Sequence, residues 1–175
     1  MSSKRRETRE LVGFTFAMVE SESENWITRA REFRDAAVLV VEAKNGSLSF
    51  PYYYNAALSL ELSLKAILVS RKKTYPTTHR LKVLSDAAGV VVEKDQEKTL
   101  EILSESISWL CRYPIPNSEG RWNNFHDVLL PKHKVVKKKV SRVMKNEKTF
   151  PTLKNYLAIW KLFESEYSSI KPAGA

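Results

Sequence analysis

A dense run of basic side chains is the first feature of the sequence with clear chemical meaning. Residues 132–145 hold seven Lys or Arg, and residues 121–154 hold ten basic and two acidic residues, a net charge of +8. The whole chain of 175 residues has a net charge of +9, so nearly all of its excess positive charge lies in this block. Like charges at this density repel one another unless an anion relieves them. The block therefore predicts RNA, or an acidic protein, as a partner.

The basic run is predicted to form one amphipathic helix over Val135–Met144. Its apolar residues recur at helical spacing and leave the basic side chains on exposed faces. The side chains that we expect to contact phosphate groups are Lys134, Lys137, Lys138 and Arg142. A helix lying on a membrane is not favoured, because the apolar face has Val and Met but no aromatic anchor. A solvated face without any partner is the alternative.

A second candidate binding element is the pair Arg112–Tyr113, which precedes Pro114 and Pro116. In one interpretation Tyr113 stacks on a base while Arg112 binds a phosphate group. In the other, Tyr113 and Trp109 fix the loop to the protein body while Arg112 pairs with a carboxylate. The sequence does not separate these two interpretations.

The sequence lacks the spacings that are typical of metal and cofactor sites. Three His residues and one Cys are scattered without zinc-ligand spacing, and no glycine-rich phosphate loop or nucleophile elbow occurs. We therefore predict neither a metal nor a cofactor. Cys111 cannot form an intramolecular disulfide, which fits the cytoplasm. The longest apolar run, Ala36–Val41, is far shorter than the about 20 residues of a membrane span, so no membrane association is expected.

The elements that must position these residues are predicted to be helices. Residues 1–10 lack an apolar period and are expected to be flexible, whereas 11–170 are expected to form one all-α domain, an antiparallel bundle of about five to seven helices. Only Val90–Val92 faintly resembles a strand. Five predicted helices span residues 11–19, 52–70, 125–130, 135–144 and 153–167. Three more are expected to begin at a capping residue: one is capped by Ser21 or Ser23 and runs to Val41, one is capped by Thr77 or Thr78 and runs to residue 88, and one is capped by Asp95 and runs to residue 110. The residues expected in the core include Trp26, Phe33, Ala57, Leu60, Leu64, Leu68, Leu103 and Ile107.

Two stretches resemble a known family. Ala57-Leu-Ser-Leu-Glu-Leu-Ser-Leu-Lys-Ala-Ile-Leu68 is followed by Thr78-His-Arg-Leu81, and Trp109-Leu-Cys-Arg-Tyr-Pro-Ile-Pro116 comes later. These stretches are similar to the long helix, the following helix start and the Trp-x-x-Arg-Tyr-Pro-x-Pro segment of a bacterial subgroup of the HEPN domain family. The resemblance covers about residues 33–125. It implies a helical bundle that usually forms a homodimer.

The resemblance also implies a candidate catalytic pair. HEPN ribonucleases have an Arg followed, after four to six residues, by a His, and Arg121 and His126 match this spacing, although Trp122 replaces the expected polar neighbour. In that reaction the 2′-hydroxyl attacks the adjacent phosphate, His126 acts as general acid or base, and Arg121 stabilises the charge that develops. For His79, we favour a structural role at a helix start, with its ring against the preceding long helix.

Two classes of function follow from these observations. In the first, the chain is a non-catalytic module that binds RNA or a nucleotide, in a toxin–antitoxin or phage-defence setting. In the second, it is a metal-independent endoribonuclease of the toxin type, whose partner could be an antitoxin. We favour the first class.

The basic run gives a prediction that does not depend on the family. Reversing Lys134, Lys137, Lys138 and Arg142 to Glu should abolish RNA binding while the helical circular dichroism signal persists. The affinity of the parent should fall with salt, with a log–log slope of about −0.7 per phosphate contact on single strands, because bound cations are released from RNA. If the RNA affinity does not change with salt or with the charge reversals, the basic run is only a solvated face. An absence of RNA binding would favour an acidic protein partner.

Overall fold

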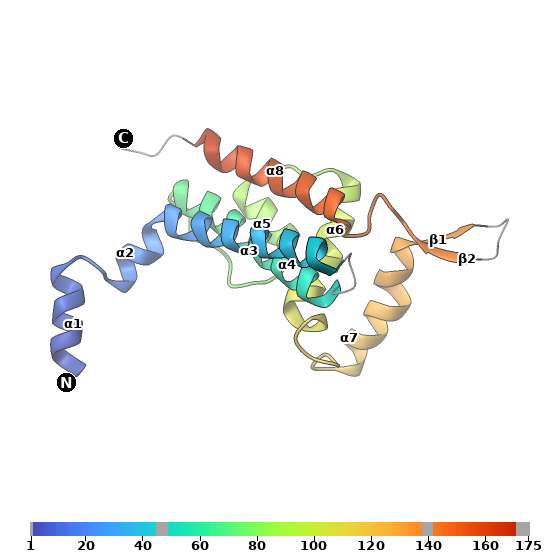
Figure 1. Cartoon of the computed structure of the whole chain (residues 1–175), viewed down its shortest axis with the longest axis horizontal. Helices are drawn as coiled ribbons and strands as arrows, with labels where there is room; N and C mark the ends of the chain where they lie inside the picture. Colours follow the sequence, from blue (N-terminus) through green and yellow to red (C-terminus); the bar gives the residue numbers. More distant parts are fainter. Residues whose placement is uncertain (1, 45–48, 138–141, 171–175) are drawn as a thin grey trace.

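The computed structural model describes residues 2–44, 49–137 and 142–170, and they form a helical bundle with a small hairpin at one end (Figure 1). The all-α fold class is therefore confirmed. The described residues form eight α-helices, one more than the upper end of the expected number. Their bounds are Ser2–Leu11 (α1), Phe16–Ser21 (α2), Ser23–Lys44 (α3), Ser49–Ser70 (α4), Leu81–Ala88 (α5), Lys94–Glu105 (α6), Glu119–Asn123 (α7) and Leu153–Ser169 (α8).

Helix α4 lies at the centre of the bundle and contacts α3, α5, α6 and α8. Side chains on all of its faces are buried, which requires neighbours on every side. The alternation of Leu at 58, 60, 62 and 64 therefore belongs to a helix surrounded by others rather than to a strand. Twelve of its residues are buried, namely Tyr52, Ala56, Ala57, Ser59, Leu60, Glu61, Leu62, Ser63, Leu64, Ala66, Ile67 and Leu68.

The polar side chains of α4 that face the interior have partners. The Ser59 hydroxyl lies 2.7 Å from the Tyr156 hydroxyl of α8. The carboxylate of Glu61 is buried; one oxygen accepts a hydrogen bond from Lys65 Nζ at 2.8 Å, and the other lies 2.8 Å from His79 Nδ1. The His79 ring thus ties the segment before α5 to the long helix, in the structural role that we favoured.

Several predicted boundaries and core positions are confirmed. Helix α3 begins at Ser23, and α5 stops before Gly89, whose φ of 73° allows its N–H to donate to the carbonyls of Ser85 and Asp86. Six of the eight expected core residues are buried. Trp26 and Phe33 pack against the core but stay partly exposed, because they lie at its edge.

The N-terminal segment differs from the expected pattern. The predicted helix over residues 11–19 is instead broken between α1 and α2, where Gly13 has a φ of 72° and Thr15 caps α2 by accepting from the Met18 N–H. Residues 2–11 form α1 although they lack an apolar period. The flexibility expected for residues 1–10 stays a prediction.

The helix predicted over Val135–Met144 is wrong. Lys134–Lys137 (β1) and Arg142–Lys145 (β2) pair as antiparallel strands, with Val135 opposite Met144 and Val136 opposite Val143. Valine is β-branched and favours extended backbone, and this preference prevails over the helical spacing of the apolar residues. In contrast, Val90–Val92 forms no strand in the described residues; it is an irregular link in which Val90 and Val92 are buried.

The segment from Ser106 to His133 contains helical turns of unusual hydrogen bonding. A π-helical turn, Ser106–Leu110 (η1), follows α6, and a second one, Asn124–Leu129 (η2), follows α7. A 3₁₀ turn, Leu130–His133 (η3), leads from η2 into β1. In the described parts of the chain, no helix combines the length and the apolar character needed to cross a membrane.

The buried Glu61 gives a stability prediction. Glu61→Gln should lower the free energy of unfolding by about 3 kcal/mol, because Lys65 keeps its charge in a largely buried site without a carboxylate partner. Urea denaturation of the variant and the parent measures this difference. Glu101→Gln, on the exposed face of α6, is the matched control and should change stability by less than about 0.5 kcal/mol. Equal losses in both variants would contradict the role of Glu61.

Candidate functional site

The guanidinium of Arg121 is held by a carboxylate. Arg121 Nε lies 2.9 Å from Glu105 Oε2, and a terminal nitrogen lies 3.2 Å from Oε1, so both oxygens of Glu105 are engaged. Trp109 Nε1 donates to Glu105 Oε2 as well, at 2.5 Å. The Ser118 hydroxyl accepts from the Arg121 N–H and caps α7, which fixes where this arginine leaves the helix. Such two-pronged pairing is the strongest contact that a guanidinium makes with a carboxylate.

Two aromatic side chains flank the half-buried ring of His126. It lies 4.3 Å from the Trp122 ring and 5.1 Å from the Phe125 ring, measured between centroids, and Trp109 packs edge-on against Phe125 at 5.4 Å. His126 Nε2 is buried and has no hydrogen-bond partner among the described residues. A general acid or base must come within hydrogen-bond reach of the proton it transfers. In this structure the buried Nε2 has no such group within hydrogen-bond reach among the described residues.

The π-turn changes how Arg121 and His126, five positions apart, are oriented relative to each other. Residues five apart in a regular α-helix point about 140° away from each other. In a π-turn the hydrogen bonds run from residue i to i+5, which brings such a pair toward one face. Arg121 lies in α7 and His126 in η2, so both belong to one continuous helical segment.

The Arg112–Tyr113 pair lies on the surface. The Arg112 guanidinium stacks over the Tyr113 ring at 5.2 Å and donates to its hydroxyl at 3.2 Å, and the Tyr113 side chain is exposed. Arg112 has no carboxylate partner in the described parts of the chain, whereas Trp109 is buried. This arrangement agrees with the surface interpretation and leaves an aromatic ring and a cation facing solvent.

The hairpin places like charges opposite each other. Lys134 pairs with Lys145 at one end of the ladder, and Lys137 pairs with Arg142 at the other. Directly opposed like charges destabilise a hairpin, so an anion bound across it would be stabilising. Lys134 and Lys145 are exposed, and Lys145 Nζ lies 4.4 Å from the centre of the Phe150 ring. Lys138 lies outside the described residues, as do the side chains of Lys137 and Arg142.

The base of the hairpin is anchored by a histidine that the sequence analysis did not single out. His133 is buried, and its Nδ1 lies 3.0 Å from the Thr149 hydroxyl, while the carbonyl of Thr149 accepts from the Thr99 hydroxyl of α6. The Asn146 N–H donates to the His133 carbonyl at 2.7 Å and closes the hairpin. Its place between two lysines gave no signal of burial.

The structure does not bring all the candidate residues together. Arg112 and Tyr113 precede the helical segment 119–133, and the hairpin follows it (Figure 1). Arg121 and His126 lie in this segment, between the two binding elements along the chain. Among the described residues, no group of three His, Cys, Asp or Glu side chains is placed to hold a metal ion.

Comparison with known proteins gives one result. The sequence model of the HEPN domain matches residues 23–143, which is more than half of the chain. This range runs from the start of α3 into β2 and includes Arg112, Arg121 and His126. No curated protein and no solved structure shows a significant match to the chain.

The buried His133 predicts how stability depends on pH. Burial lowers the pKa of His133 below its ordinary value of 6.5, and the charges of Lys98 and Lys132 act in the same direction. The folded protein therefore holds His133 neutral at a pH where the unfolded chain protonates it. The free energy of unfolding should fall below pH 6.5, by at most about 1.4 kcal/mol for each pH unit, until the folded protein also protonates.

Urea unfolding at pH 7.5 and pH 5.5 measures this dependence. His133→Gln removes the titrating ring and should make the loss between the two pH values smaller than in the parent. Thr149→Val removes a hydrogen-bond partner but keeps the ring, so the loss on acidification should persist. An identical loss in the parent and in His133→Gln would show that other groups cause it.

Proposed function

Because the chain belongs to the HEPN domain family, we propose that it is a non-catalytic member that binds RNA or a nucleotide. The observation that carries the proposal is the pair between Arg121 and Glu105. To stabilise the phosphorane of RNA cleavage, the guanidinium must meet phosphate oxygens. In this chain both oxygens of Glu105 already hold it, so a phosphate would have to displace a carboxylate that Trp109 also holds.

The surroundings of His126 support the same proposal. Aromatic rings flank the imidazole, and its Nε2 is buried away from any polar partner in the described residues. A proton donor for the leaving oxygen needs a path to that oxygen. The motif thus fits a packing role in which Arg121 joins α7 to the end of α6 and His126 packs on Trp122.

The binding surface that we propose has two parts. The hairpin supplies cations for phosphate groups, which dominate affinity for nucleic acids and make it depend on salt. The exposed Arg112–Tyr113 pair supplies a ring for a base and a guanidinium for a phosphate.

The setting that we propose follows from the family. It comprises a cytoplasmic homodimer in a toxin–antitoxin or phage-defence system, with an antitoxin or another acidic protein as a further partner. The half-buried Cys111, whose pKa burial raises to about 11, is a thiol at neutral pH and suits a reducing compartment.

The alternative function is a metal-independent endoribonuclease that uses Arg121 and His126. One observation favours it: the α-to-π transition brings residues five apart toward one face, as a catalytic pair requires. In that case RNA would have to release Arg121 from Glu105 before cleavage.

A cleavage experiment separates the two functions. End-labelled single-stranded RNA is incubated with the parent, with His126→Ala and with Glu105→Gln. The growth of host cells that express each protein is followed in parallel. We expect no cleavage and no toxicity from the parent, and RNA affinity within about twofold of the parent for His126→Ala. Cleavage by the parent that His126→Ala abolishes would establish the ribonuclease instead.

Binding needs its own control. Lys134→Glu with Lys145→Glu reverses two exposed hairpin cations and should weaken RNA binding at least about tenfold, because two phosphate contacts become repulsive. Lys154→Glu with Lys161→Glu makes the same charge change on the exposed face of α8 and should have a much smaller effect. Equal losses in both double variants would point to net charge rather than to the hairpin.

A further inference from the structure

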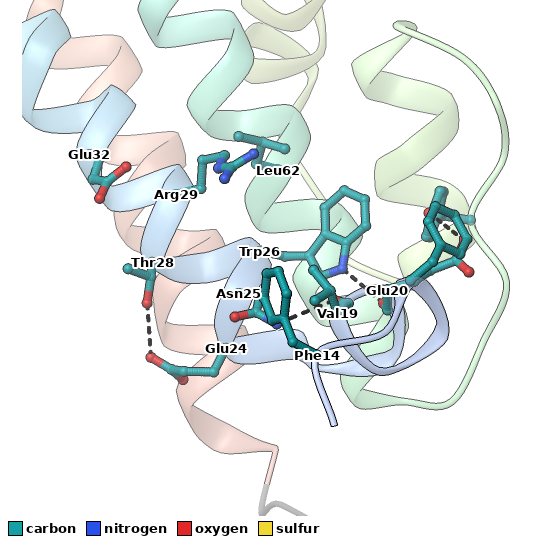
Figure 2. A pocket seen from close by; sticks show the side chains of 12 residues that line it. Phe14, Val19, Glu20, Glu24, Asn25, Trp26, Thr28, Arg29, Glu32 and Leu62 are labelled. Atoms are coloured by element: carbon teal, nitrogen blue, oxygen red, sulfur yellow. Dashed lines mark hydrogen bonds between the residues drawn. The ribbon is translucent and has the colours of Figure 1, made fainter. Parts of the chain in front are cut away.

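A cleft of about 510 Å³ lies where the N-terminal arm, residues 2–21, meets the bundle (Figure 2). Pockets for small molecules have volumes of about 300 to 1,000 Å³, so the cleft can hold one such molecule. Phe14 and Val19 line it from the arm, and Trp26, Leu62 and Tyr75 line it from the bundle. An occupant therefore meets apolar surface on both sides. Five large apolar side chains of the arm are exposed, namely Leu11, Val12, Phe14, Phe16 and Met18.

Two aromatic rings in the bundle wall of the cleft are held in fixed orientations. The Trp26 and Tyr75 rings pack edge-on, with 5.1 Å between their centroids. Trp26 Nε1 donates to the Glu20 carbonyl at 3.0 Å, and the Tyr75 hydroxyl donates to the Glu20 carboxylate at 3.1 Å. The polar groups of both rings are thus satisfied within the chain. The cleft offers a preformed aromatic wall with a carboxylate at its edge.

The same two rings already hold a cation of the protein itself. Lys65 Nζ lies 5.8 Å from the centroid of the Trp26 ring and 5.3 Å from that of the Tyr75 ring. A cation within about 6 Å of a ring centroid is attracted by the electron-rich face of the ring. Lys65 is also paired with the buried Glu61 carboxylate at 2.8 Å, which compensates its charge. The wall therefore has the kind of surface that recognises an ammonium group.

The cleft is acidic, although the chain as a whole is strongly basic. Its charged lining residues are Glu20, Glu24, Glu32 and Arg29, three acidic and one basic, a net charge of −2. The whole chain has a net charge of +9. RNA, nucleotides and other anions that the hairpin attracts are therefore repelled here. Charge complementarity selects a cation as the occupant.

Glu20 is the carboxylate best placed to meet the charge of an occupant. One of its oxygens accepts from the Tyr75 hydroxyl, and among the described residues no cation is paired with it. The two oxygens of Glu24 are already engaged by hydroxyl groups. Glu32 lies nearly two turns of α3 beyond Trp26 (Figure 2). Glu20 is thus the lining carboxylate that directly contacts the aromatic wall.

We propose that this cleft binds a small organic cation, with an ammonium or quaternary ammonium group on an apolar body. The charged group lies against Trp26 and Tyr75 beside the Glu20 carboxylate, and the apolar body fills the space toward Phe14 and Leu62. A protein partner is less well matched, because a stable protein interface buries about 800 Å² on each side. The cleft has the volume of a site for one small molecule.

Three probes that share a benzyl group and differ in the charge of a tetrahedral head test the site. Benzyltrimethylammonium is positive, benzyl methyl sulfone is neutral and benzylsulfonate is negative. The readout is the indole N–H signal of Trp26 in a ¹⁵N–¹H spectrum, which Trp26→Phe assigns by removing it. The other three Trp residues of the chain are internal controls.

The positive probe should shift the Trp26 signal and leave the other three indole signals in place. The shift should saturate with a Kd of about 1 mM or lower, which is within reach of a ligand of this size. The neutral probe should bind at least about tenfold more weakly, because it lacks the attraction to the rings and to Glu20. The negative probe should leave the Trp26 signal unchanged.

Two matched variants locate the carboxylate that contributes. Glu20→Gln keeps the shape of the side chain and an acceptor for the Tyr75 hydroxyl, but removes the charge. It should weaken binding of the positive probe about fivefold, the effect of one unit charge about 4 Å away in water. Glu22→Gln makes the same change in net charge at an exposed residue outside the cleft, and should change the Kd less than about twofold. Unchanged signals of the other indoles show that both variants are folded.

Each of four results would overturn the proposal. They are a Trp26 signal that the positive probe does not shift, equal binding of the neutral probe, equal losses in Glu20→Gln and Glu22→Gln, and a Trp26 signal that only a lysine-rich peptide shifts. The last result would make the occupant a segment of another protein. The site does not depend on RNA binding, so both variants should bind a short RNA within about twofold of the parent. A parent that fails to bind RNA would bear on the proposed function instead.

Discussion

The bundle depends on one constraint: helix α4 is buried on all sides yet has polar side chains that face the interior. A buried hydroxyl or carboxylate without a partner costs more than most single contacts contribute. The Ser59 hydroxyl donates to the Ala56 carbonyl of its own helix, whereas the buried Tyr156 hydroxyl of α8 has Ser59 as its partner. Glu61 likewise requires Lys65 and the segment before α5. These polar contacts select which helices lie beside α4 and at which height, and the surrounding leucines would accept many other arrangements.

The parts of the fold that could be predicted are those that depend on the local sequence pattern. Helices α3, α4 and α8 follow from apolar spacing and length, and the end of α5 follows from Gly89. The hairpin could not be predicted in the same way. Val136, Val140 and Val143 fit a helical stripe as well as a strand, and the anchoring of His133 to Thr149 and of Asn146 to His133 adds to the β preference of valine in favouring the extended form. Those contacts join residues that are more than ten positions apart, and the local sequence pattern does not show that they lie close together.

The candidate site shows the same division between local and distant information. The types and spacing of Arg121 and His126 are visible in the sequence, but their partners decide what the two residues do. Glu105 is 16 positions before Arg121, and the only local hint was Trp109, one turn after Glu105 in the sequence. For the Arg112–Tyr113 pair the sequence left two interpretations open, and the contact of the Arg112 guanidinium with the exposed Tyr113 ring is visible only in the structure.

The N-terminal arm and the hairpin lie at opposite ends of the long axis of the molecule (Figure 1). A partner held at the basic hairpin would therefore leave the exposed apolar side chains of the arm uncovered, and a partner on the arm would leave the hairpin open. The two ends of the molecule would thus accept different partners at the same time, which is the geometry of a connector.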